Sequence, residues 1–450
     1  MFSDRKSKFL YSLAEVSRER RSGYSWYTYA PKIVFTDDLD TLTNDMIRDN
    51  VVVMQNFPSL WYERRRDDHA RTRRADTDVW TPFYEQPFSR SGQGEAFDRL
   101  SKYDLTKWNT WYWIRLKKFA DLADQKGLLF LQEHYLQHNI IEEGAHWADY
   151  PWRSANNINN PGFAENPSYA GDKRVYMAEE FYDTTNSLRN HLHRQYIRKS
   201  LDNFKDNSNI IHHLGMEYTG PLHFVEFLLD VIGEWEKENN KKVLVMLPGT
   251  KDVQDAILAD PKRSALVDII DVIQWQYRKD GSLYSPGGGV NLAGRQYPNI
   301  MDVGETSFNQ IYRAVNQFHT KYPEKAIAYT RRGAKFSEWA VFMAGGSLAS
   351  LPIINDAAFF ENALGMANVT MKNPLSQQYV LGKKGTGYII FCESRDIKID
   401  LSDDKNNYSL KWINQSTGEI LYPKIRIIGG TATSIDAPFE DAAVAWLYKK

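Results

Sequence analysis

The sequence predicts an α/β protein, a (β/α)8 TIM barrel followed by a small C-terminal antiparallel β-sandwich domain. Between residues 24 and 367, short apolar or β-branched runs alternate eight times with longer segments of helical period. Repeated strand and helix units of this kind are the pattern of a parallel barrel. Beyond about Asn373 the helical period gives way to short alternating runs separated by turns, which are typical of antiparallel strands. A chain of 450 residues accommodates both parts, which we expect at 1–372 and 373–450.

The individual elements follow from the same periodicities. The expected barrel strands are 24–29, 51–57, 128–135, 210–217, 243–247, 269–275, 326–330 and 347–353. The expected helices are 39–49, 108–126, 184–204, 222–237, 253–258, 308–322, 337–344 and 357–367. Gly127 stops one helix just before the next strand, as helix-to-strand connections require. The expected sandwich strands are 387–393, 397–401, 408–414, 419–422 and 443–448.

The composition of the chain indicates which kinds of binding partner to expect. The 56 basic and 57 acidic side chains cancel, so charge indicates neither a nucleic acid nor a membrane surface. No apolar run approaches the roughly 20 residues of a membrane span. The single cysteine, Cys392, excludes an intramolecular disulfide and a cysteine-based metal cluster. An aromatic content of 14% favours stacking on sugar rings, although large enzymes also bury many aromatics.

The first residues, MFSDRKSKFLYSLAEVSRERR, lack the long apolar core of a secretory signal. Within them, residues 7–20 have the pattern of a charged helix, which begins almost at once. We therefore expect the chain to be either cytoplasmic or a piece of a longer polypeptide.

Three long loops leave the expected strand ends toward the following helices, at 58–104, 138–183 and 278–306. In a TIM barrel these connections form the active-site face, and loops of this length inside a compact domain are usually functional.

Glu217 is the first candidate for chemistry. In the segment NIIHHLGMEYTGP it follows an apolar run that ends in Gly215, and an amphipathic helix comes next. A carboxylate at this place in a barrel is suited to act as a catalytic acid or base. The alternative is an ion pair with one of the many arginines.

Other strand ends and one loop supply carboxylates that could act together with Glu217. Glu133 on the neighbouring strand would complete a pair of carboxylates, one donating a proton and the other acting as nucleophile or base. Strand alternation leaves open whether Glu133 points into the barrel or toward a helix. Asp68, in the loop sequence WYERRRDDH, is a third carboxylate, in what is either a solvated charge run or a site. Nearby candidates for substrate contact are Trp61, Tyr62, His69, His134, His138, Tyr218, Trp275 and Tyr277.

No cofactor is expected. His138, Glu142, Glu143 and His146 lack the HExxH order of a zinc site, so we expect no metal. The sequence contains no P-loop, and Gly287 to Gly289 are too far from a helix start to be a nucleotide fingerprint.

Several strings together resemble a known family. They are YDLTKWNTWYWIRLKKFADLADQKGLLFL, HWADYPWRSANNIN, GMEYTGP, and the C-terminal LKWINQSTGEI with APFEDAAVAWLYKK. In this order they are similar to the apiosidase-like branch of the glycoside hydrolases, over nearly the whole chain. WYERRRDDH with HWADYPWRSANNIN is most similar to a subgroup from bacteria that degrade plant polysaccharides.

The resemblance implies a retaining-glycosidase barrel with its acid/base at the end of the fourth strand, where Glu217 stands, and a nucleophile at the end of the seventh. The seventh strand instead reads AIAYTRRGA, with Thr330, Arg331 and Arg332 at the expected place of the glutamate. Either Glu133 or Asp68 supplies the second carboxylate, or Glu338 reaches in, or the retaining reaction is lost. We favour the first explanation.

The two arginines suggest a substrate. Planar guanidinium groups pair well with a carboxylate, so Arg331 and Arg332 favour an acidic, pectin-like glycan, unless they pair with barrel acids. Trp61, Trp147, Trp152 and Trp275 would supply flat faces for sugar rings. Asn156 and Asn157 would hold the third loop through backbone hydrogen bonds, and Asn157 would also contact substrate.

The leading hypothesis is therefore a glycoside hydrolase that cleaves a plant cell-wall oligosaccharide or polysaccharide, periplasmic or secreted by family resemblance. A uronate-directed lyase is the second, with Arg331 and Arg332 neutralising the carboxylate and His134, His138 or Tyr218 moving protons. The third is a glycan-binding protein on a barrel that has lost catalysis.

Overall fold

The computed structural model describes residues 8–10, 39–48, 51–56, 86–141, 147, 150–165, 178–215, 217–290, 303–331, 335–371, 377–440 and 442–449. The chain divides into two compact units. The larger unit comprises Leu10–Trp275 and Ser285–Val303, and the second unit comprises Met1–Phe9, Gln276–Tyr284 and Gly304–Lys450. The strand β1 (Lys8–Leu10) falls at this division.

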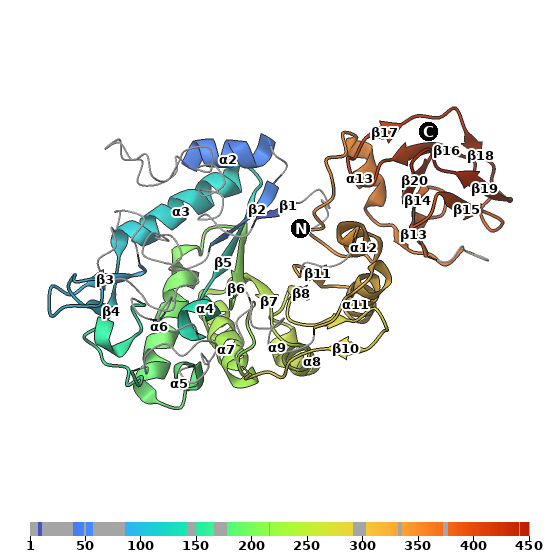
Figure 1. The fold of residues 1–450 in the computed structure, drawn as a ribbon. Coiled ribbons are helices and arrows are strands. Elements are labelled where there is room, and N and C mark those ends of the chain that lie inside the picture. Colours follow the sequence, from blue (N-terminus) through green and yellow to red (C-terminus); the bar gives the residue numbers. More distant parts are fainter. Residues whose placement is uncertain are drawn as a thin grey trace. The chain divides into compact units, whose positions relative to one another are not determined.

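The centre of the larger unit is a parallel sheet (Figure 1). Its strands run in the order β2 (Val51–Asn56), β5 (Leu129–Glu133), β6 (Ile210–His213), β7 (Leu244–Leu247) and β8 (Ile269–Asp271). Nearly every residue of these strands is buried, as expected for parallel strands covered by helices. The alternation of strands and helices predicted from the sequence is confirmed for these five strands, although four of them, β5, β6, β7 and β8, are shorter than predicted.

Helices lie beside this sheet and connect its strands (Figure 1). They are α2 (Leu39–Arg48), α3 (Thr110–Gln125), α4 (Gln137–Ile141), α5 (Ala178–Tyr182), α6 (Ser187–Asn203), α7 (Leu222–Asn239), α8 (Lys251–Ala259) and α9 (Pro261–Ser264). Asn109 and Asn186 cap α3 and α6 by accepting from backbone N–H groups of the first turn. A short hairpin, β3 (Phe88–Arg90) with β4 (Tyr103–Trp108), and a 3-10 turn, Ser154–Asn156, lie in the connecting segments.

The second unit contains the hairpin of β9 (Gln276–Tyr277) and β10 (Leu283–Tyr284). It continues through α11 (Phe308–Lys321), β11 (Ala326–Ala328), α12 (Ser337–Met343) and α13 (Ala357–Ala363). None of the described helices in either unit is long and apolar enough to cross a membrane.

The expected strand at 347–353 was wrong, since these residues form no strand. Leu348 has a left-handed backbone, with φ of 58°, which interrupts an extended run. Pro352 has no N–H to donate to a neighbouring strand. Ser347 N still donates to Ile327 O of β11 at 2.7 Å, whereas Leu351 N turns back to Ala349 O at 2.8 Å. The strand expected at 24–29 lies outside the described residues.

The C-terminal part of the second unit is antiparallel, as predicted. One sheet has the order β12 (Ala367–Asn368), β13 (Gln378–Lys383), β14 (Gly387–Cys392), β20 (Ala443–Tyr448), β16 (Tyr408–Ile413) and β17 (Ile420–Leu421), and β18 (Arg426–Ile427) also pairs with β16. A separate ribbon joins β15 (Asp396–Asp400) to β19 (Ala432–Asp436). Ile397 and Ile399 of the ribbon share one core with Ile390, Leu410 and Leu447 of the sheet. The α/β fold with a C-terminal antiparallel region is thus confirmed, and the domain boundary at 372/373 stays a prediction.

Candidate active site at the strand ends

Alternation along β5 shows which side chains face the barrel interior. The ring of Phe130 packs against Phe119 of α3 and Phe204, with centroids 5.2 and 5.8 Å apart. Phe130 therefore faces the helices, and because strand side chains alternate, Leu131 and Glu133 face the opposite side. The orientation of Glu133, which the sequence left open, is toward the interior.

Glu133 meets side chains from both neighbouring strands. Its side chain is fully buried, and Gln55 of β2 donates from Nε2 to Glu133 Oε1. His213 of β6 stands beside Glu133 in the strand register, with Nδ1 3.8 Å from the same oxygen. A buried carboxylate is costly without donors, so Gln55 stabilises Glu133 at the carboxyl end of the sheet.

His213 has an electrostatic environment that keeps it neutral. Burial lowers the pKa of His213 to about 4, and Asp271 on β8 acts in the opposite direction. His213 is therefore uncharged at neutral pH. Asp271 is itself buried, and sequence reasoning missed it because it stands inside the apolar run DIIDVI without a turn to mark a strand end.

His134 belongs to the helix-facing layer. Its ring stacks on that of His212, with centroids 5.4 Å apart, and both are buried. Burial lowers the pKa of both imidazoles, that of His212 to about 3. The structure thus places His134 with His212 and gives its ring no exposed face.

Glu217 occupies a strained turn directly after β6. Its φ is 57°, in the left-handed region that residues with a side chain rarely adopt, and it is half-buried. Gly215, two residues earlier, passes so close to Tyr135 that an added Cβ would lie 2.0 Å from Tyr135 O. Strained backbone of this kind clusters at functional sites, which supports the choice of Glu217.

The residues after Glu217 hold the turn in place. Thr219 N donates to Gln137 Oε1 at 2.7 Å, and Gln137 Nε2 donates to Thr219 Oγ1 at 2.8 Å. Tyr218 is buried against Tyr182, and its hydroxyl donates to Pro221 O at 2.8 Å. Burial also raises the pKa of Tyr218 well above its usual value. Tyr218, predicted to contact substrate, is therefore a buried support of the turn in this structure.

The described tryptophans of the third loop are also core residues. Trp147 and Trp152 are each 1% exposed, and Trp152 stacks on His193 at 4.6 Å. Neither ring has an open face for a sugar. Asn157 holds the loop as expected, because its Nδ2 donates to the carbonyl oxygens of Pro151, Trp152 and Arg153.

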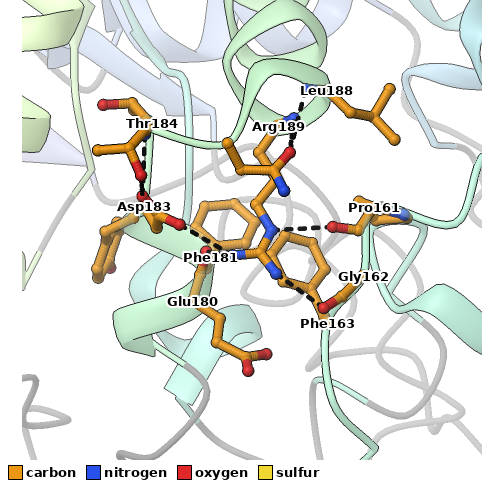
Figure 2. Close-up of polar contacts among 12 residues, drawn as sticks. Pro161, Gly162, Phe163, Glu180, Phe181, Asp183, Thr184, Leu188 and Arg189 are labelled. Carbon is orange, nitrogen blue, oxygen red and sulfur yellow. Dashed lines mark hydrogen bonds and ion pairs between the residues drawn. The ribbon is translucent and has the colours of Figure 1, made fainter.

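Arg189 joins this loop to the helices (Figure 2). From α6 its Nε donates to Pro161 O at 2.9 Å and its Nη2 to Gly162 O at 2.7 Å. Its Nη1 contacts Glu180 O at 3.2 Å and Asp183 Oδ2 at 3.3 Å, at and just after the end of α5. One buried guanidinium therefore satisfies carbonyl groups from two segments that are distant in sequence.

Trp275, which follows β8 in the larger unit, has a buried ring. It is fully buried, and its Nε1 donates to Gln254 Oε1 at 2.8 Å. The ammonium of Lys251 lies 5.3 Å from the ring centroid. Trp275 was predicted to stack on a sugar ring, but in this structure neither face of its ring is exposed.

In the second unit, Tyr277 and Arg331 are fixed by amides. The Tyr277 hydroxyl donates to Gln317 Oε1 at 2.7 Å, and Arg331 Nε donates to Gln276 Oε1 at the same distance. Arg331 is half-buried, with its guanidinium 5.7 Å from the ring centroid of Tyr284.

Five predicted residues lie outside the described part of the chain, as does the side chain of His138. The five are Trp61, Tyr62, Asp68, His69 and Arg332. Within the described residues, no three His, Cys, Asp or Glu side chains gather as metal ligands would.

The chain matches one known protein family. The family model described as "Domain of unknown function (DUF6298)" matches residues 30–366. The chain belongs to this family. No curated protein matches the sequence.

Solved structures show the fold relationship. A glycoside hydrolase family 5 protein from Bacteroides vulgatus ATCC 8482 superimposes with a TM-score of 0.50 at 11% identity, covering 91% of this chain and 85% of that one. A protein described as "Glycoside hydrolase" gives 0.46 at 11% identity, with coverages of 92% and 88%. A family 44 xyloglucanase from Paenibacillus polymyxa gives 0.39 at 11% identity, with coverages of 89% and 94%. The first similarity shows that this chain has the fold of TIM-barrel glycoside hydrolases.

Proposed function

We propose that the protein is a glycoside hydrolase of a plant cell-wall glycan, with Glu217 as its general acid/base. The observation that carries the proposal is the position of Glu217, on a strained turn at the carboxyl end of a parallel barrel strand. Similarity in fold to a family 5 glycoside hydrolase supports the reaction class. Within that class we place the chain in the apiosidase-like branch, on its GMEYTGP and HWADYPWRSANNIN segments.

We assign the second carboxylate to Glu133. It points to the interior from the strand next to β6, and Gln55 fixes one of its oxygens. One carboxyl group would protonate the leaving oxygen while the other attacks the sugar or activates a water. A separation of about 5 to 5.5 Å between the two carboxyl groups favours retention, and roughly 6.5 to 9.5 Å favours inversion. Asp68 remains the alternative partner.

For the substrate we propose an acidic, pectin-like glycan. Arg331 supports this, because its bond to Gln276 Oε1 holds a half-buried guanidinium in one orientation. A fixed, planar cation suits a sugar carboxylate.

Elimination receives less support than hydrolysis. The proton carriers named for a lyase include His134, which is buried against His212, and Tyr218, whose hydroxyl is bonded to Pro221 O. A lyase product would absorb as an unsaturated uronide, whereas hydrolysis leaves a free reducing end formed with solvent oxygen.

The test is the substitution Glu217→Gln. Removing the acid/base should lower sugar release from pectin digests by about 10²- to 10⁴-fold, because protonation of the leaving group is lost. Exposed Glu179 on α5 gives the matched control, and Glu179→Gln should retain activity. Thermal unfolding of both variants should match the parent chain. Near-normal activity in Glu217→Gln would remove Glu217 from the mechanism, and tight binding without turnover by the parent chain would identify a binding protein instead.

A further inference from the structure

A pocket in the larger unit lies away from the strand ends, between helices α3 and α6. Its volume is about 710 Å³, within the range of small-molecule sites. The lining residues come from α3, α6 and the end of β4, none of which carries Glu217 or Glu133. They include Trp108, Trp113, Ile114, Lys118 and Lys199.

The walls of this pocket differ in chemistry. One wall is apolar and aromatic, formed by Trp108, Trp113, Ile114 and Leu122, and the side chain of Ile114 is 63% exposed. The rest is cationic and amide-bearing, with Lys117, Lys118, Lys199, Gln125 and Asn203. A flat apolar face beside hydrogen-bonding amides suits a pyranose ring, whose C–H face is apolar and whose edge is polar.

The charge of the pocket is not balanced internally. Asp121 is the carboxylate of the lining, and Lys117 forms an ion pair with it. Among the described residues, no carboxylate lies within ion-pair distance of Lys118 or Lys199, although the charge of Asp202, on the same helix, acts on Lys199. The ammonium of Lys199 lies 5.2 Å from the centroid of the Trp113 ring, and burial lowers its pKa. A partly desolvated ammonium of this kind would gain from an anion.

We propose that this pocket is a second glycan site that binds a carboxylated sugar, with its carboxylate between Lys118 and Lys199 and its ring against Trp108 and Ile114. The choice of a glycan as the source of the carboxylate rests on the proposed function, but the site itself does not require Glu217. Such a site would retain an acidic chain on the enzyme surface while another part of the chain is cleaved.

The experiment reads the pocket directly through the methyl signal of Ile114. The full chain carrying Glu217→Gln, which should hydrolyse the probe about 10²- to 10⁴-fold more slowly than the parent, is titrated with trigalacturonate and followed by methyl NMR. The Ile114 signal, assigned with Ile114→Val, should shift and saturate. Lys118→Gln and Lys199→Gln should each weaken binding by about tenfold, the amount expected for one charge-assisted bond at a partly exposed site. A higher salt concentration should weaken the binding of trigalacturonate to the parent pocket, because salt screens its contacts with the lysines.

Controls separate the site from general effects. Lys237→Gln on α7, outside the pocket, should bind like the parent. Ile114→Glu replaces an exposed side chain, so it should fold normally, and the methyl signal of Leu122, which also lines the pocket, should report weaker binding caused by charge repulsion. Cellotriose, which lacks the carboxylate, should not shift Ile114 at the same concentration.

Three results would overturn the proposal. They are no Ile114 shift at millimolar trigalacturonate, an equal response to cellotriose, and equally tight binding of inorganic phosphate, which would indicate a general anion site. Hydrolysis is assayed separately with Glu217 intact. Activity without an Ile114 shift would remove the second site alone, and a lysine-dependent shift without activity would remove the proposed function alone.

Discussion

At the scale of single residues, the GMEYTGP segment depends on close backbone approach as well as on its carboxylate. Gly215 is required because the Tyr135 carbonyl occupies the space of a Cβ. Glu217 then accepts a left-handed backbone, an unfavourable conformation that the bonds of Thr219 and Tyr218 maintain.

The substitution Gly215→Ala tests this packing. Its Cβ would meet backbone 2.0 Å away, which only a shift of the turn can relieve, so we expect a loss of about 2–4 kcal/mol in unfolding free energy. Gly127→Ala is the matched control, since Gly127 has φ of 72° with open space around it and should cost only about 1 kcal/mol. Urea unfolding measures both. Equal costs would show that the contact with Tyr135 is not limiting.

At the scale of elements, the sequence predicted most of the scaffold and less of the site. The periodicity located β5, β6 and α3, because buried strands and amphipathic helices leave clear patterns. The same periodicity predicted a strand at 347–353 that does not form, because the left-handed backbone of Leu348 turns the chain. It also could not show that Trp152 is covered, because the aromatic side chains that bury it come from distant segments.

The sequence alone could not show which way the Glu133 side chain points, or that Asp271 lies near His213 in the site. A strand with both faces buried loses the alternation that would reveal which face is interior. The proximity of His213 to Glu133 likewise depends on the register between β5 and β6, which sequence alone does not fix.

Arg189 provides a prediction at the element scale. Arg189→Lys keeps the charge but loses the planar fork that reaches Pro161 O and Gly162 O, so residues 158–163 should become more open to hydrogen exchange. We expect a stability loss of about 1–3 kcal/mol, from buried carbonyl groups left without donors. Arg194→Lys, on the same helix but paired with Glu234 at the surface, should change stability by less than about 0.5 kcal/mol. Unchanged exchange at 158–163 in Arg189→Lys would contradict the proposed clamp.

At the scale of the whole molecule, buried neutral histidines link stability to pH. Burial lowers the pKa of His193, His212 and His213 to about 3, 3 and 4. Unfolded histidine titrates near 6.5, so between pH 6.5 and these values the unfolded chain binds more protons. Stability is therefore full above about pH 6.5 and falls as the pH decreases toward 4, by up to about 1.4 kcal/mol per pH unit for each histidine.

His212→Gln, which removes one buried imidazole on the helix-facing side, should make this pH dependence shallower. Exposed His191→Gln should leave it unchanged. Urea unfolding at intervals between pH 4.5 and 7.5 measures the slopes. Identical slopes in His212→Gln and the parent would show that His212 is not the source of the linkage.

The chain has the fold of TIM-barrel glycoside hydrolases, and Glu217 occupies a strand-end position in this fold. Fold alone does not determine the reaction, because one barrel supports many chemistries. The role of Glu217 must therefore be tested through the bond that it is proposed to protonate.

The most direct measurement compares leaving groups in Glu217→Gln. Once the released sugar is known, its natural glycan and its 4-nitrophenyl glycoside are assayed side by side with the parent chain. Because the nitrophenolate leaves without a proton, we expect kcat/KM to fall by about 10²-fold or more on the glycan and by less than about tenfold on the aryl glycoside in the cleavage step. Equal losses on the two substrates, or no loss on either, would contradict the assignment of Glu217 as the catalytic acid.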